Sequence, residues 1–253
     1  MTYSWPAIVG ILVLMLMAGT LIARWFRIAR DDREGLVGAL IAPTLLAVYL
    51  VVSALGIVIG WENTDAGKSE VADEAVTVTN LYWVAGTQPA DGAVKRDLRA
   101  YVTSVVRDEW PAMADGDLSD TTDQHLRDLR RSVAGIKANS YSTAEDRMLA
   151  LQDVDKLVEL RSDRDNVAGP AVPPLLVAVT LLTALIVAAL PFAAGAGGSR
   201  ANIFWSVVSL AFVAGSAALL LLLDNAYAGP LAVTPTAISD TLTTFTHIDQ
   251  TLR

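Results

Sequence analysis

Residues 36–60 read LVGALIAPTLLAVYLVVSALGIVIG, and residues 61–70 follow as WENTDAGKSE. The first stretch contains no Asp, Glu, Lys, Arg or His, and it exceeds the ~20 apolar residues with which a helix crosses a bilayer. The second stretch is polar and acidic. Because a charge at the centre of a span costs about 2.5–3.5 kcal/mol, this boundary predicts a membrane helix that continues into an extramembrane domain.

Three other stretches share this apolar, uncharged character, over about residues 5–23, 171–192 and 203–223. The sequence therefore predicts an all-α integral membrane protein with four transmembrane helices and a helical-bundle domain inserted between the second and the third. We divide the chain into a first transmembrane hairpin, an acidic helical extramembrane domain, a second transmembrane hairpin and a C-terminal extramembrane tail, over residues 1–60, 61–169, 170–223 and 224–253.

Composition excludes several classes of function. The chain has no cysteine and two histidines, so thiolate chemistry and histidine-based metal sites are not expected. Residues 61–169 hold 13 basic and 21 acidic residues, whereas the rest of the chain holds six of each. An acidic domain argues against nucleic acid as a partner. We find no nucleophile elbow, phosphate loop or zinc-helix motif, and we expect neither an enzyme nor a bound cofactor.

The arginines near the spans predict the orientation. Basic residues near span ends number five on one side and three on the other: Arg24, Arg27, Arg30, Arg33 and Arg200 against Lys68, Arg161 and Arg164. The positive-inside rule places both hairpin tips in the cytoplasm. The acidic domain and both termini are then extracytoplasmic. Because the arginines follow the first span instead of preceding it, we expect an anchor and not a cleaved signal peptide.

The acidic domain predicts amphipathic helices over about 70–86, 91–110 and 118–137, and a fourth that opens at a Ser142-x-x-Glu145 capping box. Pro111 is expected to end the second helix, and the breakers in 169–174 the fourth. The apolar faces expected to form the core comprise Val94, Leu98, Tyr101, Val102, Val105 and Val106, then Leu126, Leu129, Val133 and Ile136, then Met148, Leu151 and Val158. In the tail, a weak stripe over 238–252 predicts a helix that packs on this bundle or on a neighbouring subunit.

The second span carries a stripe of small and polar residues on one helical face, which includes Tyr49, Ser53, Gly56 and Gly60. One interpretation is close helix–helix packing, for which small residues four apart are the usual device. The other is the wall of a pore in an oligomer, with Tyr49 and Ser53 facing water.

Two further sets of polar residues have the same ambiguity. Glu62, Asp65 and Glu70 follow the second span and would form rings that attract cations if several subunits surrounded an axis; otherwise they are a solvated helix face. The fourth span carries a polar stripe that either bonds between helices or lines a hydrated path, made of Asn202, Ser206, Ser209, Ser216 and Asp224. Asp108 and Glu109 are adjacent and point about 100° apart on a helix, so they predict no acid/base pair.

An ordered series of short motifs resembles the uncharacterised bacterial bestrophin-like membrane family. The series comprises Gly35 to Trp61-Glu62, Glu74-Ala75, Leu81-Tyr82, Tyr101, Glu109-Trp110-Pro111-x-Met113, Leu223-Asp224 and Gly229-Pro230-x-x-Val233-x-Pro235. Asn225-Ala226-Tyr227 departs from the family pattern, which usually has Pro-Phe soon after the Asp. The resemblance implies four spans, a bacterial cell membrane and, through a distant analogy with the anion channels called bestrophins, ion conduction. Bestrophins keep their large domain in the cytoplasm, which conflicts with the arginine count.

Two functions are consistent with these features. The first is a passive, homo-oligomeric ion channel, which the acidic collar inclines toward cations. The alternative is a non-conducting scaffold or sensor whose extramembrane domain binds a partner. A proton-coupled pump is disfavoured because the spans hold no ionisable group.

Overall fold

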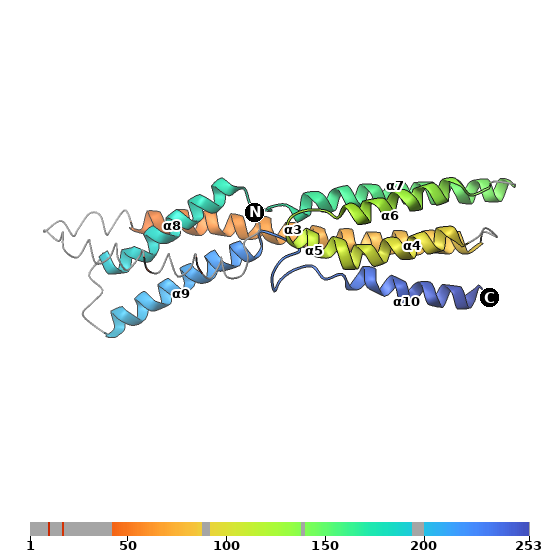
Figure 1. The fold of residues 1–253 in the computed structure, drawn as a ribbon. Coiled ribbons are helices and arrows are strands. Elements are labelled where there is room, and N and C mark those ends of the chain that lie inside the picture. The colour runs from red at the N-terminus through yellow and green to blue at the C-terminus, as the bar shows by residue number, and fades with distance from the viewer. Residues whose placement is uncertain are drawn as a thin grey trace.

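The computed structural model describes Gly10, Met17 and residues 42–87, 92–137, 140–193 and 200–252. All regular structure in these residues is helical, and Figure 1 shows an elongated molecule with two parts. The first predicted span, 5–23, and the start of the second lie outside the described ranges, apart from Gly10 and Met17. Of the described helices, one is long and apolar enough to cross a membrane, over Pro43–Gly86, and two shorter apolar helices lie over Pro174–Leu190 and Ser206–Leu222.

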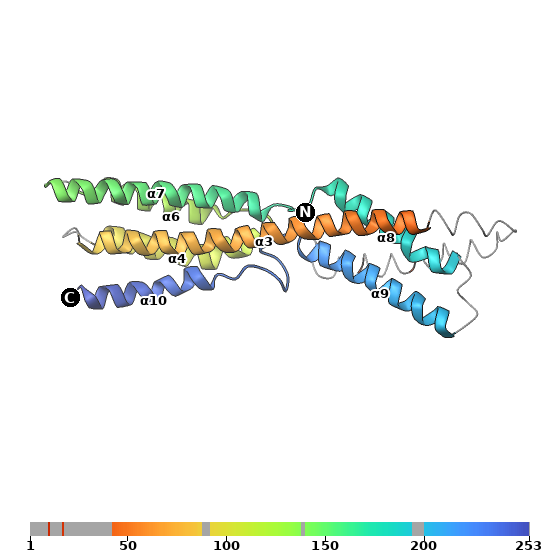
Figure 2. The same ribbon diagram turned by 180° about the vertical axis from the view of Figure 1, so that it is seen from behind.

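Helix α3 (Ala42–Thr87) runs through both parts of the molecule (Figures 1 and 2). At 1.5 Å per residue its 46 residues extend about 69 Å. Its first half packs against α8 (Pro174–Ala193) and α9 (Arg200–Leu222). Its second half packs against α7 (Tyr141–Ala168) and α10 (Thr236–Thr251). The predicted continuation of the second apolar stretch into the bundle as one helix is therefore confirmed.

The bundle also contains α4 (Ala93–Ser104), the π-helical turn η2 (Val105–Glu109), α5 (Trp110–Ala114) and α6 (Asp120–Ala134). The core faces predicted for α4 and α6 are confirmed, because Leu98, Tyr101, Leu129 and Val133 are fully buried. The tail helix α10 packs on this same bundle, where its Phe245 stacks on Tyr82 of α3 with ring centroids 4.0 Å apart.

Three local predictions were wrong. Pro111 does not end its helix: the wider π turn takes up an extra residue, and Pro111 then occupies the first turn of α5, where its missing N–H costs nothing. The cap of α7 is Ser140 paired with Thr143, two residues before the predicted box. Met148 and Val158 of α7 are exposed, since the buried face is instead made of Ala150, Val154, Leu157, Leu160, Arg164 and Val167.

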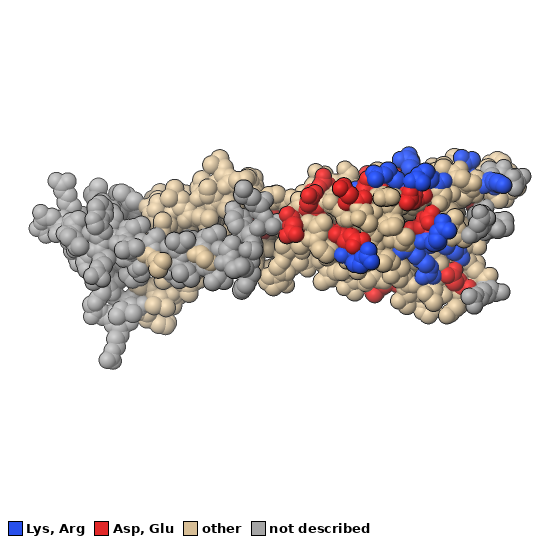
Figure 3. All heavy atoms as spheres, in the orientation of Figure 1, with Lys and Arg blue, Asp and Glu red and all other residues tan. Residues whose placement is uncertain are grey.

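Charged side chains gather on one part of the molecule. In Figure 3, every blue or red residue lies over the bundle, and the described residues around α8 and α9 show none. The apolar segments end at one level, because the amide of Ala171 donates to the carbonyl of Asp224 over 2.8 Å and Gly60 lies against Leu223. The point at which the sequence changes from uncharged to charged is thus also the point at which the apolar helices end and the bundle begins.

Candidate functional site

The polar stripe of α3 faces the chain's own helices. The Tyr49 side chain is fully buried, and its hydroxyl donates to the carbonyl of Val213 over 3.1 Å and lies 2.5 Å from the Ser216 hydroxyl, both on α9. Ser53 is 4% exposed and donates to the carbonyl of Leu50 in its own helix. This arrangement matches close packing within one subunit. The pore-wall interpretation stays a prediction for an assembly of several copies.

The two glycines of the stripe permit this packing. A methyl group added at Gly60 would lie 2.7 Å from the Cβ atom and 2.8 Å from the carbonyl oxygen of Leu223. A methyl group at Gly56 would collide with the end of the Leu220 side chain. Both contacts join α3 to α9 or its end, as expected where small residues bring helix backbones close together.

The three carboxylates predicted as a collar do not share one environment. Glu62 and Asp65 are exposed. Glu70 is half-buried, and its Oε2 atom is shielded from solvent with no hydrogen-bond partner among the described residues. Glu70 is therefore partly enclosed by the bundle, whereas the other two remain available to solvent ions.

The fourth-span stripe is mostly covered. Ser206 and Asp224 are buried, and Ser209 and Ser216 are half-buried. The Asp224 carboxylate accepts from the amide of Val172 over 3.1 Å and so ties the end of α9 to the start of α8. The side chain of Asn202 lies outside the described set.

The strongest polar feature is a buried ion pair between α3 and α7. Neither Glu74 nor Arg164 has any exposed side-chain surface, and the Nη2 atom of Arg164 donates to Oε1 of Glu74 over 3.0 Å. The hydroxyl of Tyr101 on α4 donates to the same oxygen over 2.5 Å. An isolated charge in such surroundings is very costly, so each member depends on the others.

A second ion pair lies close by. Glu109 is fully buried and accepts from Nε of Arg161 over 3.0 Å and from the amide of Ser119 over 2.9 Å. Arg161 also donates to Asp123 over 3.2 Å. The two pairs occupy successive turns of α7, and together with Tyr101 they form the buried ionic cluster: Glu74, Tyr101, Glu109, Arg161 and Arg164.

Burial and charge change the proton affinities in this region. Desolvation and the neighbouring Glu74 raise the pKa of Tyr101 well above its ordinary value. For Arg164, desolvation lowers the pKa but Glu74 and its neighbours raise it more, so this arginine stays charged. Desolvation, followed by repulsion from Asp163, raises the pKa of Glu70 to about 7.

The link between α9 and α10, residues 223–235, fastens the apolar part to helix α5 of the bundle. Asn225 donates to the carbonyl of Met113 over 3.2 Å, and Trp110 donates from its indole nitrogen to the carbonyl of Val233 over 3.1 Å. The Trp110 ring meets the edge of Tyr227 with centroids 5.5 Å apart. The Asn-Ala-Tyr segment, which departs from the family pattern, therefore makes specific contacts with α5.

The motif residues meet in space. Glu74, Tyr101 and Glu109 belong to the cluster, and Trp110 and Met113 contact the link. Sequence reasoning missed the two arginine partners on α7, which it counted as span-flanking charges. Motif carboxylates on otherwise apolar helix faces were the available signal, because a buried carboxylate requires a cation or donors.

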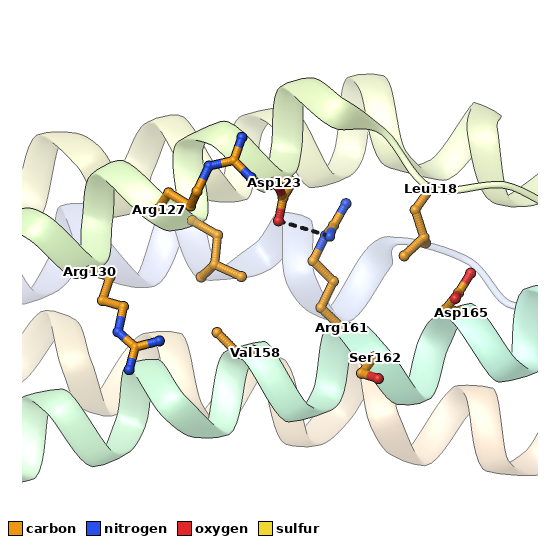
Figure 4. A pocket seen from close by; sticks show the side chains of 9 residues that line it. Leu118, Asp123, Arg127, Arg130, Val158, Arg161, Ser162 and Asp165 are labelled. Carbon is orange, nitrogen blue, oxygen red and sulfur yellow. Dashed lines mark hydrogen bonds and ion pairs between the residues drawn. The ribbon is translucent and has the colours of Figure 1, made fainter.

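A cleft of about 380 Å³ lies between α6 and α7 beside the cluster (Figure 4). Its walls carry three guanidinium groups, but each is already paired: Arg161 and Arg127 with Asp123, and Arg130 with Asp155. The cleft therefore offers little net charge to an anion. Among the described residues no group of three His, Asp or Glu side chains could hold a metal ion.

These features define a helical protein with an apolar end and an ion-paired bundle joined by one helix. A family model described as the bestrophin-like domain matches residues 9–238, so the chain belongs to the bestrophin-like family. No curated protein and no solved structure matches the chain.

Proposed function

We propose that the chain is a four-span integral protein of the bacterial cell membrane. Helices α8 and α9 have 20 and 23 residues, about 30 and 35 Å, which suits the ~30 Å hydrocarbon core. Large apolar side chains point outward along α3, α8 and α9, as lipid contact requires: Val51, Leu55, Leu175, Leu182, Phe204 and Phe212. Trp61 stands at the boundary, where aromatic residues favour the bilayer interface.

Within the membrane, the function that the geometry supports best is that of a non-conducting scaffold or sensor. The single observation that carries this proposal is the continuity of α3, which forms part of the apolar end and part of the bundle core without interruption. The ionic cluster and the link hold the bundle to the same helix. A shift of the spans is therefore transmitted to the bundle surface, and binding to the bundle is transmitted back.

The second candidate is the passive, homo-oligomeric ion channel that leans toward cations. Membership of the bestrophin-like family and the exposed carboxylates Glu62 and Asp65 favour it. We rank it second because Tyr49 and Ser53, the polar side chains predicted to face a pore, donate hydrogen bonds to carbonyl groups of the same subunit. Conduction along this stripe requires α3 to separate from α9 in the assembly.

The orientation remains our proposal of an extracytoplasmic bundle. Of the three basic residues counted on that side, Arg161 and Arg164 are paired inside the bundle, and Lys68 is exposed. The positive-inside rule still counts all three, and five basic residues against three favour hairpin tips in the cytoplasm. We also propose that the protein is not an enzyme and needs no cofactor, since the charged members of the ionic cluster pair with one another and no group of three His, Asp or Glu side chains in the described part of the chain could hold a metal ion.

Subunit stoichiometry and ion flux separate the two candidates. The scaffold predicts a monomer or dimer by native mass spectrometry, no ion flux from liposomes above that of empty vesicles, and a stoichiometric partner cross-linked to the bundle in native membranes. The channel predicts a closed ring of at least about four subunits and a cation flux that Glu62→Gln lowers. A conducting ring would overturn our ranking, and a non-conducting monomer without a partner would overturn both candidates.

A further inference from the structure

Apart from the Oε2 atom of Glu74 and the Nη1 atom of Arg164, which face each other at 3.0 Å in the ion pair, three buried polar atoms in this part of the bundle lack a hydrogen-bond partner among the described residues. They are the Tyr227 hydroxyl, Oε2 of Glu70 and Nε of Arg164. Tyr227 is 3% exposed and Arg164 is 0% exposed, and although Glu70 is half-buried its Oε2 atom is shielded, so bulk water does not satisfy these three atoms. Buried polar atoms without partners are rare in native proteins and commonly mark an ordered water molecule or an ion.

The three groups share one region. Tyr227 interacts electrostatically with Arg164 and with Glu70, and Glu70 interacts with Arg164. Gly67, one turn before Glu70 on α3, brings the helix backbone close to the tyrosine: a methyl group added there would lie 3.3 Å from the Tyr227 hydroxyl. The region is therefore bounded by α3, α7 and the link, with a donor, an acceptor and a hydroxyl that is both.

The charge around Glu70 favours a bound proton. The charged and titratable groups that face it are Asp73 and Glu74 on its own helix, Asp163 and Arg164 on α7, and Tyr227 in the link. Arg164 is the single cation among them and is already paired with Glu74. Four carboxylates thus share one guanidinium, and a proton on Glu70 relieves the repulsion.

We propose that Glu70, Arg164 and Tyr227 enclose a hydrated proton-binding site, in which ordered water completes their hydrogen bonds and Glu70 carries the exchangeable proton. The raised pKa of Glu70, about 7, agrees with this arrangement. The site lies where the link meets α3, so proton uptake acts on the contact between the bundle and the apolar end. It does not depend on which candidate function is correct.

The sign of the pH effect follows from the raised pKa. The folded state holds the proton up to a pH of about 7, whereas the unfolded carboxyl loses it near the ordinary value of 4.5. The contribution of Glu70 to the free energy of unfolding is therefore complete below 4.5 and is lost as the pH rises to about 7. Relative to Glu70→Gln, the wild-type chain becomes less stable over that interval.

Infrared pH-difference spectra of the full chain in mild detergent test the site. We expect a carboxylic acid C=O band that disappears with a midpoint near neutral pH, that Glu70→Gln abolishes and that the exposed control Glu62→Gln retains. Its persistence in Glu70→Gln, or a titration confined to acidic pH, would overturn the proposal.

A second variant covers the case in which Glu70→Gln does not fold. Tyr227→Phe keeps the ring on Trp110 and removes only the hydroxyl that shares the proposed water. The midpoint of the band is expected to shift in this variant. An unchanged midpoint, with unchanged thermal stability, would mean that the hydroxyl and Glu70 share no water and would refute the hydrated site.

Discussion

Replacing Arg164 by methionine tests the buried ionic cluster directly. Both side chains of the Glu74–Arg164 pair are fully buried, so the substitution leaves a carboxylate whose remaining donor is the Tyr101 hydroxyl. Removing one partner of a buried pair costs about 3–5 kcal/mol. We expect a loss of that size in the free energy of unfolding, measured by denaturant titration of the helical circular dichroism signal in mild detergent.

The double variant Glu74→Leu, Arg164→Met provides the discriminating comparison. It removes both charges and leaves one unpaired hydroxyl on Tyr101, which costs about 1–3 kcal/mol. The double variant is therefore expected to be more stable than Arg164→Met alone. The matched control is Arg130→Met, whose ion pair with Asp155 is more than half exposed on both sides and is worth at most about 1 kcal/mol. The reasoning fails if Arg164→Met costs no more than this control, or if the loss in the double variant equals the sum of the losses in Arg164→Met and Glu74→Leu measured separately.

Other contacts give further predictions. Gly60→Ala should destabilise the protein by about 1–3 kcal/mol, because the added methyl group meets the backbone of Leu223. The control Gly215→Ala has open space and should be nearly neutral. Equal thermal midpoints for the two variants would contradict this prediction. Two cations of α4 bind the Asp249 carboxylate and lower its pKa to about 2 from 3.8. The stabilisation that this carboxylate contributes is present above pH 3.8 and is lost as the pH falls toward 2. The stability of Asp249→Asn should therefore depend less on pH between 3.8 and 2 than that of the wild-type chain. Trp110→Phe removes the bond to the link and should cost about 0.5–1.5 kcal/mol, visible as faster proteolysis of the link; unchanged cleavage would count against it.

Local patterns predicted the elements whose buried faces are mainly apolar. In α4 and α6 the apolar residues lie on one helical face and the charged residues on the other, and the predicted apolar residues are buried in the structure. The face of α7 was misassigned because its buried side contains the charged Arg164, which a hydropathy pattern excludes from a core. Met148 and Val158 are apolar but solvent-exposed, and they drew the prediction to the wrong side.

The candidate site depends on pairings that are distant in sequence. Glu74 and Arg164 are 90 residues apart, and Glu109 and Arg161 are 52 apart. No local spacing connects such residues, and each appears alone as an ordinary surface charge. Their partners become apparent only when the bundle places α3, α4 and α7 side by side.

The central claim is that the polar face of α3 packs against helices of the same subunit and is not exposed to a water-filled pathway. The chain contains no cysteine, so single cysteines can be introduced without removing others. Labelling of Ser53→Cys with a membrane-impermeant maleimide, in protein embedded in lipid bilayers, tests this claim, with the exposed Glu62→Cys as the reactive control. We predict that Ser53→Cys stays unlabelled while Glu62→Cys reacts; labelling of both at similar rates in folded protein would contradict the account and support a pore along α3.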